Sequence, residues 1–313
     1  MAHANADERE QAPHDCAHHK PGAVAHQMAT RALRTALILT AVLFVAEVVG
    51  GIVSNSLALL ADAGHMLTDV AGVALALFAI RFAARPATPE RTYGYYRAEI
   101  LAALANAIVL IGISFYILYE AWQRFRNPPD VESATMLWVA GIGLVVNLVS
   151  MRILRDASTE SLNMKGAYFE VLSDMLTSIG VIIAGVIMLT TGWYYADPIV
   201  SAGIGLFILP RTWRLLREAV SVLLEGTPAD VNLAAVRDTV MATPGASDVH
   251  DLHVWSLTSG RNALSAHVVM APGSDHTAVL RAAQAAINQA HATIVHVTLQ
   301  VEPPGWEQAD THT

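Results

Sequence analysis

The stretch SLALLADAGHMLTDVAGVALALFAI, residues 56–80, decides the fold. It is apolar and long enough to cross the roughly 30 Å of hydrocarbon in a bilayer as a helix. It also holds His65 and Asp69, whose i, i+4 spacing places both side chains on one helix face, about one turn apart. Ionisable groups at membrane depth are costly and usually mark an ion path. The stretch therefore predicts a membrane helix that carries cation ligands.

A second stretch, GAYFEVLSDMLTSIGVIIAGVIML at residues 166–189, repeats the pattern with Glu170 and Asp174. Imidazole and carboxylate groups together are common ligands of zinc and other late divalent metals. If the two helices touch, the two pairs complete a four-ligand shell for Zn²⁺. The close approach is expected to be permitted by four glycines: Gly64, Gly72, Gly180 and Gly185. The alternative is that these polar groups only hydrogen-bond between helices. Two other roles stay open for four further acidic residues, a structural place at a span end or the lining of a hydrated vestibule: Glu47, Asp62, Glu99 and Glu120.

Composition points to membrane spans joined to a more polar domain. Of 313 residues, 54% are hydrophobic and 15% are charged, unlike an ordinary soluble domain. The last apolar run is short and ends at Pro210, with a helical continuation through RTWRLLREAVSVLL as the alternative. We predict a helical membrane domain with six transmembrane helices over residues 31–224. Its candidate spans are 33–54, 57–80, 98–122, 134–153, 166–191 and 195–210.

Basic residues predict the orientation of these spans. Twelve Arg or Lys residues flank one side and two flank the other, which places both termini in the cytoplasm. The single cysteine, Cys16, excludes an internal disulfide and suits a reducing compartment. Residues 1–30 lack the apolar core of a signal peptide and are predicted to be a disordered, histidine-containing tail. The twelve basic residues on the predicted cytoplasmic side of the spans are Arg31, Arg34, Arg81, Arg85, Arg91, Arg97, Arg152, Arg155, Lys165, Arg211, Arg214 and Arg217. The two on the opposite side are Arg124 and Arg126.

The character of the sequence changes at Glu225. From there to residue 304, helical and alternating patterns follow in the order αββαβ, which predicts a small α+β domain with helices on one face of a sheet, followed by a tail over 305–313. Nine Asp or Glu residues oppose three Arg in this part of the chain, within a formal net charge of −8. An acidic cytosolic face raises the local cation concentration. We expect no nucleic-acid partner.

The thirteen histidines are unevenly distributed. Five lie in the first 30 residues, seven lie after Glu225, and His65 alone lies between them. The segment HDCAHH at residues 14–19 is either a weak metal-trapping tract or a solvated tail.

Two other classes of protein fit the sequence less well. A membrane metalloenzyme would need a hydrolytic motif, but the chain has no HExxH sequence, and the four ligands leave no evident open position. We therefore expect no enzyme. A membrane-anchored metal sensor would use the cytosolic histidines, but it has no use for ligand pairs inside the membrane.

Four stretches carry a family resemblance: AEVVGGIVSNSLALLADAGHMLTDV, RTYGYYRAEILAALANA, SLNMKGAYFEVLSDMLTSIGV and VHDLHVWSLTSG. Over residues from about 30 to 302 the chain resembles the cation diffusion facilitator family, most closely its bacterial cobalt–zinc–cadmium resistance branch. The resemblance implies a homodimeric efflux transporter of the bacterial inner membrane with a ferredoxin-like cytosolic domain. Such a transporter exchanges divalent metal for protons by alternating access and confers heavy-metal resistance.

The resemblance also implies which residues bind metal. The transport site falls on His65, Asp69, Glu170 and Asp174, and many zinc-transporting relatives have histidine where this chain has Glu170. Zn²⁺ is the first expectation, as substrate and as regulatory ion, and the extra carboxylate makes Co²⁺ or Cd²⁺ plausible passengers. The loop RFAARPATPERTYGYYR, residues 81–97, has no histidine or cysteine and is not predicted to bind metal. Cytosolic ligands map onto the three predicted strands: His250, His267, His296 and Glu302.

Overall fold

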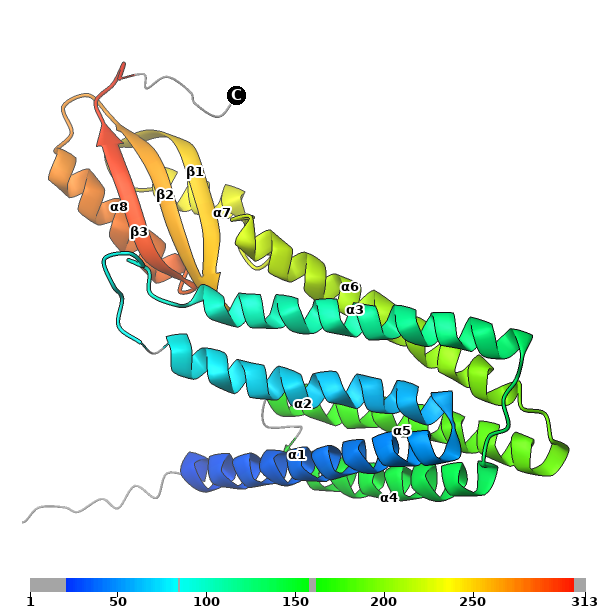
Figure 1. Cartoon of the computed structure of the whole chain (residues 1–313). Helices are drawn as coiled ribbons and strands as arrows, with labels where there is room; N and C mark the ends of the chain where they lie inside the picture. The colour runs from blue at the N-terminus through cyan, green and yellow to red at the C-terminus, as the bar shows by residue number, and fades with distance from the viewer. Residues whose placement is uncertain (1–20, 84, 158–161, 307–313) are drawn as a thin grey trace, which may run out of the picture.

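The computed structural model describes residues 21–83, 85–157 and 162–306. In these ranges six long helices are followed by a small sheet domain at one end of the helical part (Figure 1). The elements are α1 (Pro21–Ser54), α2 (Leu57–Ala83), α3 (Arg97–Arg126), α4 (Ser133–Ala157), α5 (Leu162–Thr191), α6 (Ala196–Leu223), α7 (Leu233–Met241), β1 (Ala246–Thr258), β2 (Arg261–Met270), α8 (His276–Ala290) and β3 (Ile294–Glu302).

The helical part has an apolar exterior. From Ile38 onward the exposed side chains of α1 are all large and apolar, and most of them recur at helical spacing: Ile38, Val42, Val45, Val49, Ile52 and Val53. Such a stripe suits lipid, since every backbone polar group of a helix is bonded internally. Within the described residues, α1, α3, α4, α5 and α6 are long and apolar enough to span a bilayer, and α2 contributes a shorter apolar segment, Leu57–Leu67. The predicted fold class, a helical membrane domain followed by an α+β domain, is confirmed, and the chain is a multi-pass membrane protein.

Two helix boundaries refine the predictions. Helix α1 is described from Pro21, so residues 21–30 of the predicted tail lie in a helix, and the prediction for residues 1–20 lies outside the described residues. Proline is favoured in the first turn of a helix, where its missing N–H costs nothing. Helix α6 continues through Pro210 to Leu223, which confirms the longer of the two alternatives for the last span.

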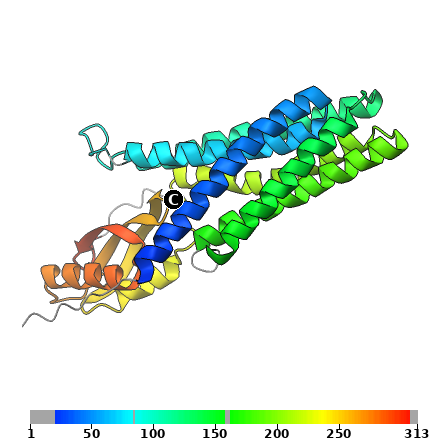
Figure 2. The same ribbon diagram turned by 90° about the horizontal axis from the view of Figure 1, so that it is seen from below.

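The helices pack as two groups joined by α2. Helix α3 lies along α6, α4 lies along α5, and α1 packs on α4 and α2 (Figures 1 and 2). Helix α2 contacts α3 and α6 on one side and α5 on the other. A Cβ on Gly64 would lie 2.9 Å from Ile113 of α3, and one on Gly185 would lie 2.8 Å from Leu137 of α4. These glycines therefore permit the α2–α3 and α4–α5 contacts, not the α2–α5 contact for which they were predicted.

A buried carboxylate ties α6 to the beginning of α2. Asp197 is 0% exposed, and its oxygens accept hydrogen bonds from the Leu57 N–H at 2.9 Å and the Ala58 N–H at 3.1 Å. The Ser56 hydroxyl donates to the same carboxylate at 2.7 Å, and the Arg124 guanidinium donates to it at 3.4 Å. A negative group at a helix N-terminus satisfies open N–H donors and matches the helix dipole. Asp197 thus caps a helix other than its own.

The C-terminal domain has the predicted αββαβ order. Its sheet order is β1-β2-β3, with β1 antiparallel to β2 and β2 parallel to β3. Helices α7 and α8 pack against β1 and β3, and their apolar faces join a core that includes Val236, Leu264 and Ile287. Both helices begin at a side-chain cap, Asn232 for α7 and Asp275 for α8.

The sheet domain meets the membrane domain at the beginning of α3 (Figure 1). Glu99 of α3 accepts hydrogen bonds from the hydroxyls of Thr258 and Ser259, the latter at 3.0 Å, at the end of β1. Arg97 forms an ion pair with Glu225 at 2.8 Å. Glu99, left open between a structural and a path-lining role, is therefore part of a contact between domains.

Candidate metal centres

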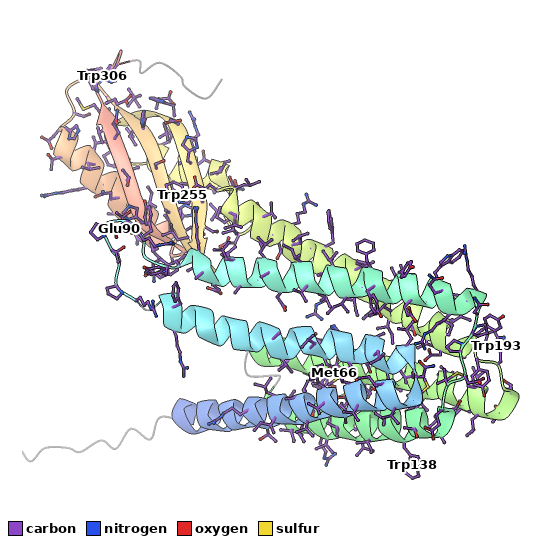
Figure 3. The ribbon with its side chains drawn as sticks, in the orientation of Figure 1. Met66, Glu90, Trp138, Trp193, Trp255 and Trp306 are labelled. Atoms are coloured by element: carbon purple, nitrogen blue, oxygen red, sulfur yellow. The ribbon has the colours of Figure 1, made fainter. Side chains whose placement is uncertain are left out.

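The first candidate centre lies between α2 and α5. His65 Nε2 lies 3.6 Å from Glu170 Oε1 and 3.7 Å from Asp174 Oδ1, so one turn of α5 faces one turn of α2. His65 is 6% exposed and Asp174 is 3% exposed. Met66, the next residue after His65, lies about midway along the helical domain (Figure 3). Three of the four predicted ligands are therefore brought together inside the membrane domain.

Asp69, the fourth predicted ligand, lies on α2 one turn after His65. Its side chain is outside the described residues. Helical spacing alone places it on the face that carries His65.

Arg211 of α6 also reaches this centre, and sequence reasoning missed it. Its Nη1 donates to Glu170 Oε1 at 2.7 Å and its Nη2 donates to Glu170 Oε2 at 2.5 Å. From the sequence alone, Arg211 is only one of the charges flanking the last span. The signal that could have found it is its place after Pro210, inside a helix that runs on toward the cytosolic domain.

Two further carboxylates lie beside the centre. The Thr177 hydroxyl of α5 lies 2.7 Å from Asp62 Oδ1 of α2 and 2.8 Å from the carbonyl oxygen of Asp174. Glu47 of α1 is 1% exposed and is close enough to Asp62 and Asp174 to interact with their charges. Its Oε2 has no hydrogen-bond partner among the described residues. Buried acidic groups this dense require a compensating cation or protons.

The second candidate centre lies on the sheet of the C-terminal domain. His250 of β1 pairs directly with His267 of β2, and Glu302 of β3 lies beside them, 1% exposed. The distance from His250 Nε2 to Glu302 Oε2 is 3.1 Å, and that from His267 Nδ1 to Glu302 Oε1 is 3.0 Å. One ligand atom from each residue lies within 4.8 Å of the others. His267 Nδ1 is close to the carboxylate without the alignment of a hydrogen bond, as expected of ligands that share an ion.

A bulge in β1 adds groups to this cluster. The pairing of β1 with β2 is irregular between His250 and His253, and Asp251 there has a φ of 51°. Asp251 Oδ1 lies 2.8 Å from His253 Nε2, and Oδ2 lies 3.8 Å from His267 Nε2.

The structure does not bring His296 to the cytosolic cluster. It lies six residues before Glu302 on β3, which is about 20 Å along an extended strand. Its partner on β2 is Ala263, and its ring packs edge-on against Tyr93, with ring centroids 5.6 Å apart. The prediction that it joins the ligands came from the family resemblance, which gives one histidine to each predicted strand but not its position along that strand.

These features define a class of protein: a membrane protein for metal cations, with one candidate ligand set inside its helical domain and a second candidate set on a polar domain. Two family descriptions match the chain: "Cation efflux transmembrane domain" over residues 33–224 and "Cation efflux protein, cytoplasmic domain" over residues 228–304. The chain belongs to the cation efflux family, which confirms the family resemblance found in the sequence.

Characterised relatives agree over nearly their whole length. The metal cation efflux system protein CzcD of Cupriavidus metallidurans is 49% identical over 280 residues, 90% of this chain and 89% of the relative. The cadmium, cobalt and zinc/H(+)-K(+) antiporter of Bacillus subtilis is 42% identical over 82% of this chain and 83% of its own. Zinc transporter ZitB of Escherichia coli is 42% identical over 90% of each chain. The protein is a metal cation efflux transporter.

Proposed function

We propose that the protein exports Zn²⁺, and also Co²⁺ and Cd²⁺, from the cytoplasm in exchange for protons. The observation that carries the proposal is the convergence of His65 with Glu170 and Asp174, with His65 Nε2 less than 4 Å from both carboxylates. Asp69 is proposed as the fourth ligand from its helical spacing. The metal is the substrate, which is moved without being chemically converted, so we assign no enzymatic reaction.

The choice of metal rests on the ligands and on the relatives. One imidazole with carboxylates suits zinc but excludes neither cobalt nor cadmium. The names of the relatives include zinc alone and cadmium, cobalt and zinc together. A carboxylate at Glu170 in place of a second imidazole favours the broader range.

Proton exchange follows from competition for the same atoms. A metal ion binds neutral imidazole and ionised carboxylates, so each binding event releases protons and each protonation expels metal. Alternating access then opens the centre to the cytoplasm for metal loading and to the outside for proton loading. The buried carboxylates of Glu47 and Asp62, the latter joined to α5 through Thr177, support a path through which cations reach the centre.

Orientation and assembly are also proposals. The basic residues flanking the spans support cytoplasmic termini in a bacterial inner membrane. The family resemblance supports a homodimer held in part by the C-terminal domain. The cluster of His250, His267 and Glu302 on that domain is proposed as a regulatory zinc site.

The same cluster favours a second candidate function. A membrane-anchored metal sensor would bind zinc at His250, His267 and Glu302 without moving it. Uptake of zinc into vesicles separates the two, because a sensor binds metal but transports none.

The test is metal-dependent proton flux in proteoliposomes that contain the full chain. We expect Asp174→Ala and Asp69→Ala to abolish zinc transport, whereas Asp230→Ala, which removes an exposed carboxylate of the C-terminal domain, leaves transport intact. Undiminished zinc transport in both membrane variants would overturn the proposed site. Zinc binding without any flux in the wild-type protein would favour the sensor.

A further inference from the structure

A pocket of about 250 Å³ lies where the membrane domain meets the sheet domain. One wall is the loop between α2 and α3, and the other is formed by the end of β1 and the beginnings of β2 and β3. Figure 1 shows this loop beside that end of the sheet. This is the loop over residues 81–97, in which no metal site is predicted. The pocket also includes His296, which lies outside the cytosolic cluster. The polar side chains in its lining are Arg85, Thr92, Tyr93, Tyr96, Arg261 and His296.

The pocket carries positive charge and no negative charge. Arg85, Arg261 and His296 contribute cationic or donor groups, and no Asp or Glu is among the lining residues, all of which belong to the described part of the chain. The nearest acidic residue in sequence, Glu90, lines a neighbouring pocket. A concave site with two guanidinium groups and no carboxylate attracts anions.

Aromatic rings, not carboxylates, hold the cations in place. Arg85 Cζ lies 4.5 Å from the ring centroid of Phe82, and Arg261 Cζ lies 4.8 Å from that of Tyr96. Arg261 also donates to the Tyr96 hydroxyl at 3.2 Å, which leaves that hydroxyl proton available to a ligand. Stacking on a ring restrains a guanidinium without neutralising its charge, and its N–H groups can still donate hydrogen bonds to an oxyanion.

Arg261 joins the sheet domain to Tyr96, but other contacts also hold the two domains together. Glu99 with Thr258 and Ser259, and Arg97 with Glu225, already join the beginning of α3 to the sheet domain. A purely structural role for Arg85 and Arg261 would leave two arginines facing one cavity without a counter-charge, which is unfavourable unless an anion enters.

The position of the pocket narrows the class of anion that it can bind. It lies at the end of α2 and the beginning of α3, where Phe82 and Tyr95 pack edge-to-face with centroids 4.7 Å apart. Aromatic side chains at helix ends mark the headgroup level of a bilayer, and basic pockets on the cytoplasmic side bind anionic headgroups. The volume lies below the roughly 300–1,000 Å³ of sites for larger organic ligands, so a small charged group fits best.

We propose that this pocket binds a phosphate group, presented by an anionic lipid headgroup or as free phosphate. Arg85 and Arg261 would each donate to its oxygens, and the hydroxyls of Thr92 and Tyr96 and the ring of His296 would supply further donors. Because Arg85 belongs to the membrane domain and Arg261 to the sheet domain, the bound phosphate bridges the two. Occupancy of the pocket therefore stabilises one arrangement of the sheet domain against the membrane.

The test uses the full chain in detergent and isothermal titration with three probes: soluble short-chain phosphatidylglycerol, the matched phosphatidylcholine and inorganic phosphate. We expect phosphatidylglycerol or phosphate to bind, and Arg85→Gln with Arg261→Gln to weaken that binding at least about tenfold. The charge-matched control, Arg217→Gln with Arg281→Gln, should bind as the wild type does.

The three probes separate the two sources of phosphate. Binding of phosphatidylglycerol alone identifies a lipid headgroup, and equal binding of inorganic phosphate identifies the free anion. The proposal is overturned if neither binds, or if the Arg85/Arg261 variant binds as tightly as the control variant does. Zinc binding at the cytosolic cluster, measured on the same samples, verifies that the variant is folded.

Discussion

Arg211 and Glu170 form a two-point ion pair, with N–O distances of 2.7 and 2.5 Å. Because Glu170 Oε1 also lies 3.6 Å from His65 Nε2, the guanidinium competes for an oxygen that faces the candidate metal centre. A planar guanidinium that binds both carboxylate oxygens is among the strongest charge-assisted pairs. Helix α6 thus supplies a tethered cation to a site whose other groups come from α2 and α5.

The first prediction follows from this competition. In Arg211→Gln the metal ion no longer has to displace a guanidinium, so we expect the dissociation constant for zinc at the membrane centre to fall about tenfold. Isothermal titration of the full chain measures it, in a background of His250→Ala and His267→Ala that silences the cytosolic cluster.

Arg214→Gln is the matched control, since it removes an exposed charge one turn further along α6. Its affinity should equal that of the background protein. Equal affinities in the Arg211 and Arg214 variants would mean that the guanidinium and the metal do not compete.

Local spacing predicted much of the membrane centre. The i, i+4 pairs placed Glu170 and Asp174 on one helix face because helical periodicity is a property of neighbouring residues. Whether His65 lies level with Glu170 depends on helix tilt and on where each helix begins, and no local pattern gives either. Arg211 is 41 residues from Glu170, and a basic residue near a helix end is ordinarily a flanking charge.

The C-terminal domain shows the same limit. The order αββαβ and the turn after Thr258 could be predicted from alternation and turn residues. The position of His296 relative to the other histidines could not be predicted. Parity assigns its side chain to a face of the sheet, but the parallel register of β3 on β2 decides its position along the strand. That register depends on the whole crossover through α8, which is not a local property.

A second prediction concerns selectivity. Glu170→His replaces a carboxylate with a second imidazole and removes the ion pair with Arg211, so we expect the zinc-to-cadmium transport ratio to rise by roughly tenfold. Metal uptake by proteoliposomes measures the ratio. The variant Glu170→His with Arg211→Gln separates the new ligand from the lost ion pair, and an unchanged ratio in both would contradict the role given to Glu170.

A third prediction concerns the cytosolic cluster. His267→Ala removes a ligand between His250 and Glu302, so we expect the full chain to lose about one tightly bound zinc ion, since a structural site rarely survives the loss of a ligand. Equilibrium dialysis measures the stoichiometry. His296→Ala should leave it unchanged, because that residue lies far along β3. An equal loss of bound zinc in both variants would mean that His296 is a zinc ligand as well.

The last prediction concerns the carboxylate that caps α2 from α6. Asp197→Ala leaves the N–H groups of Leu57 and Ala58 without their acceptor and the Arg124 guanidinium without a buried partner. Removing one member of a buried charged network costs about 3 kcal/mol or more, so we expect the melting temperature in detergent to fall by several degrees. Asp197→Asn keeps one acceptor oxygen and should fall less, whereas Asp130→Ala, an exposed carboxylate before α4, should not change it. A melting temperature that stays the same in Asp197→Ala would mean that the α2–α6 contact is held by packing alone.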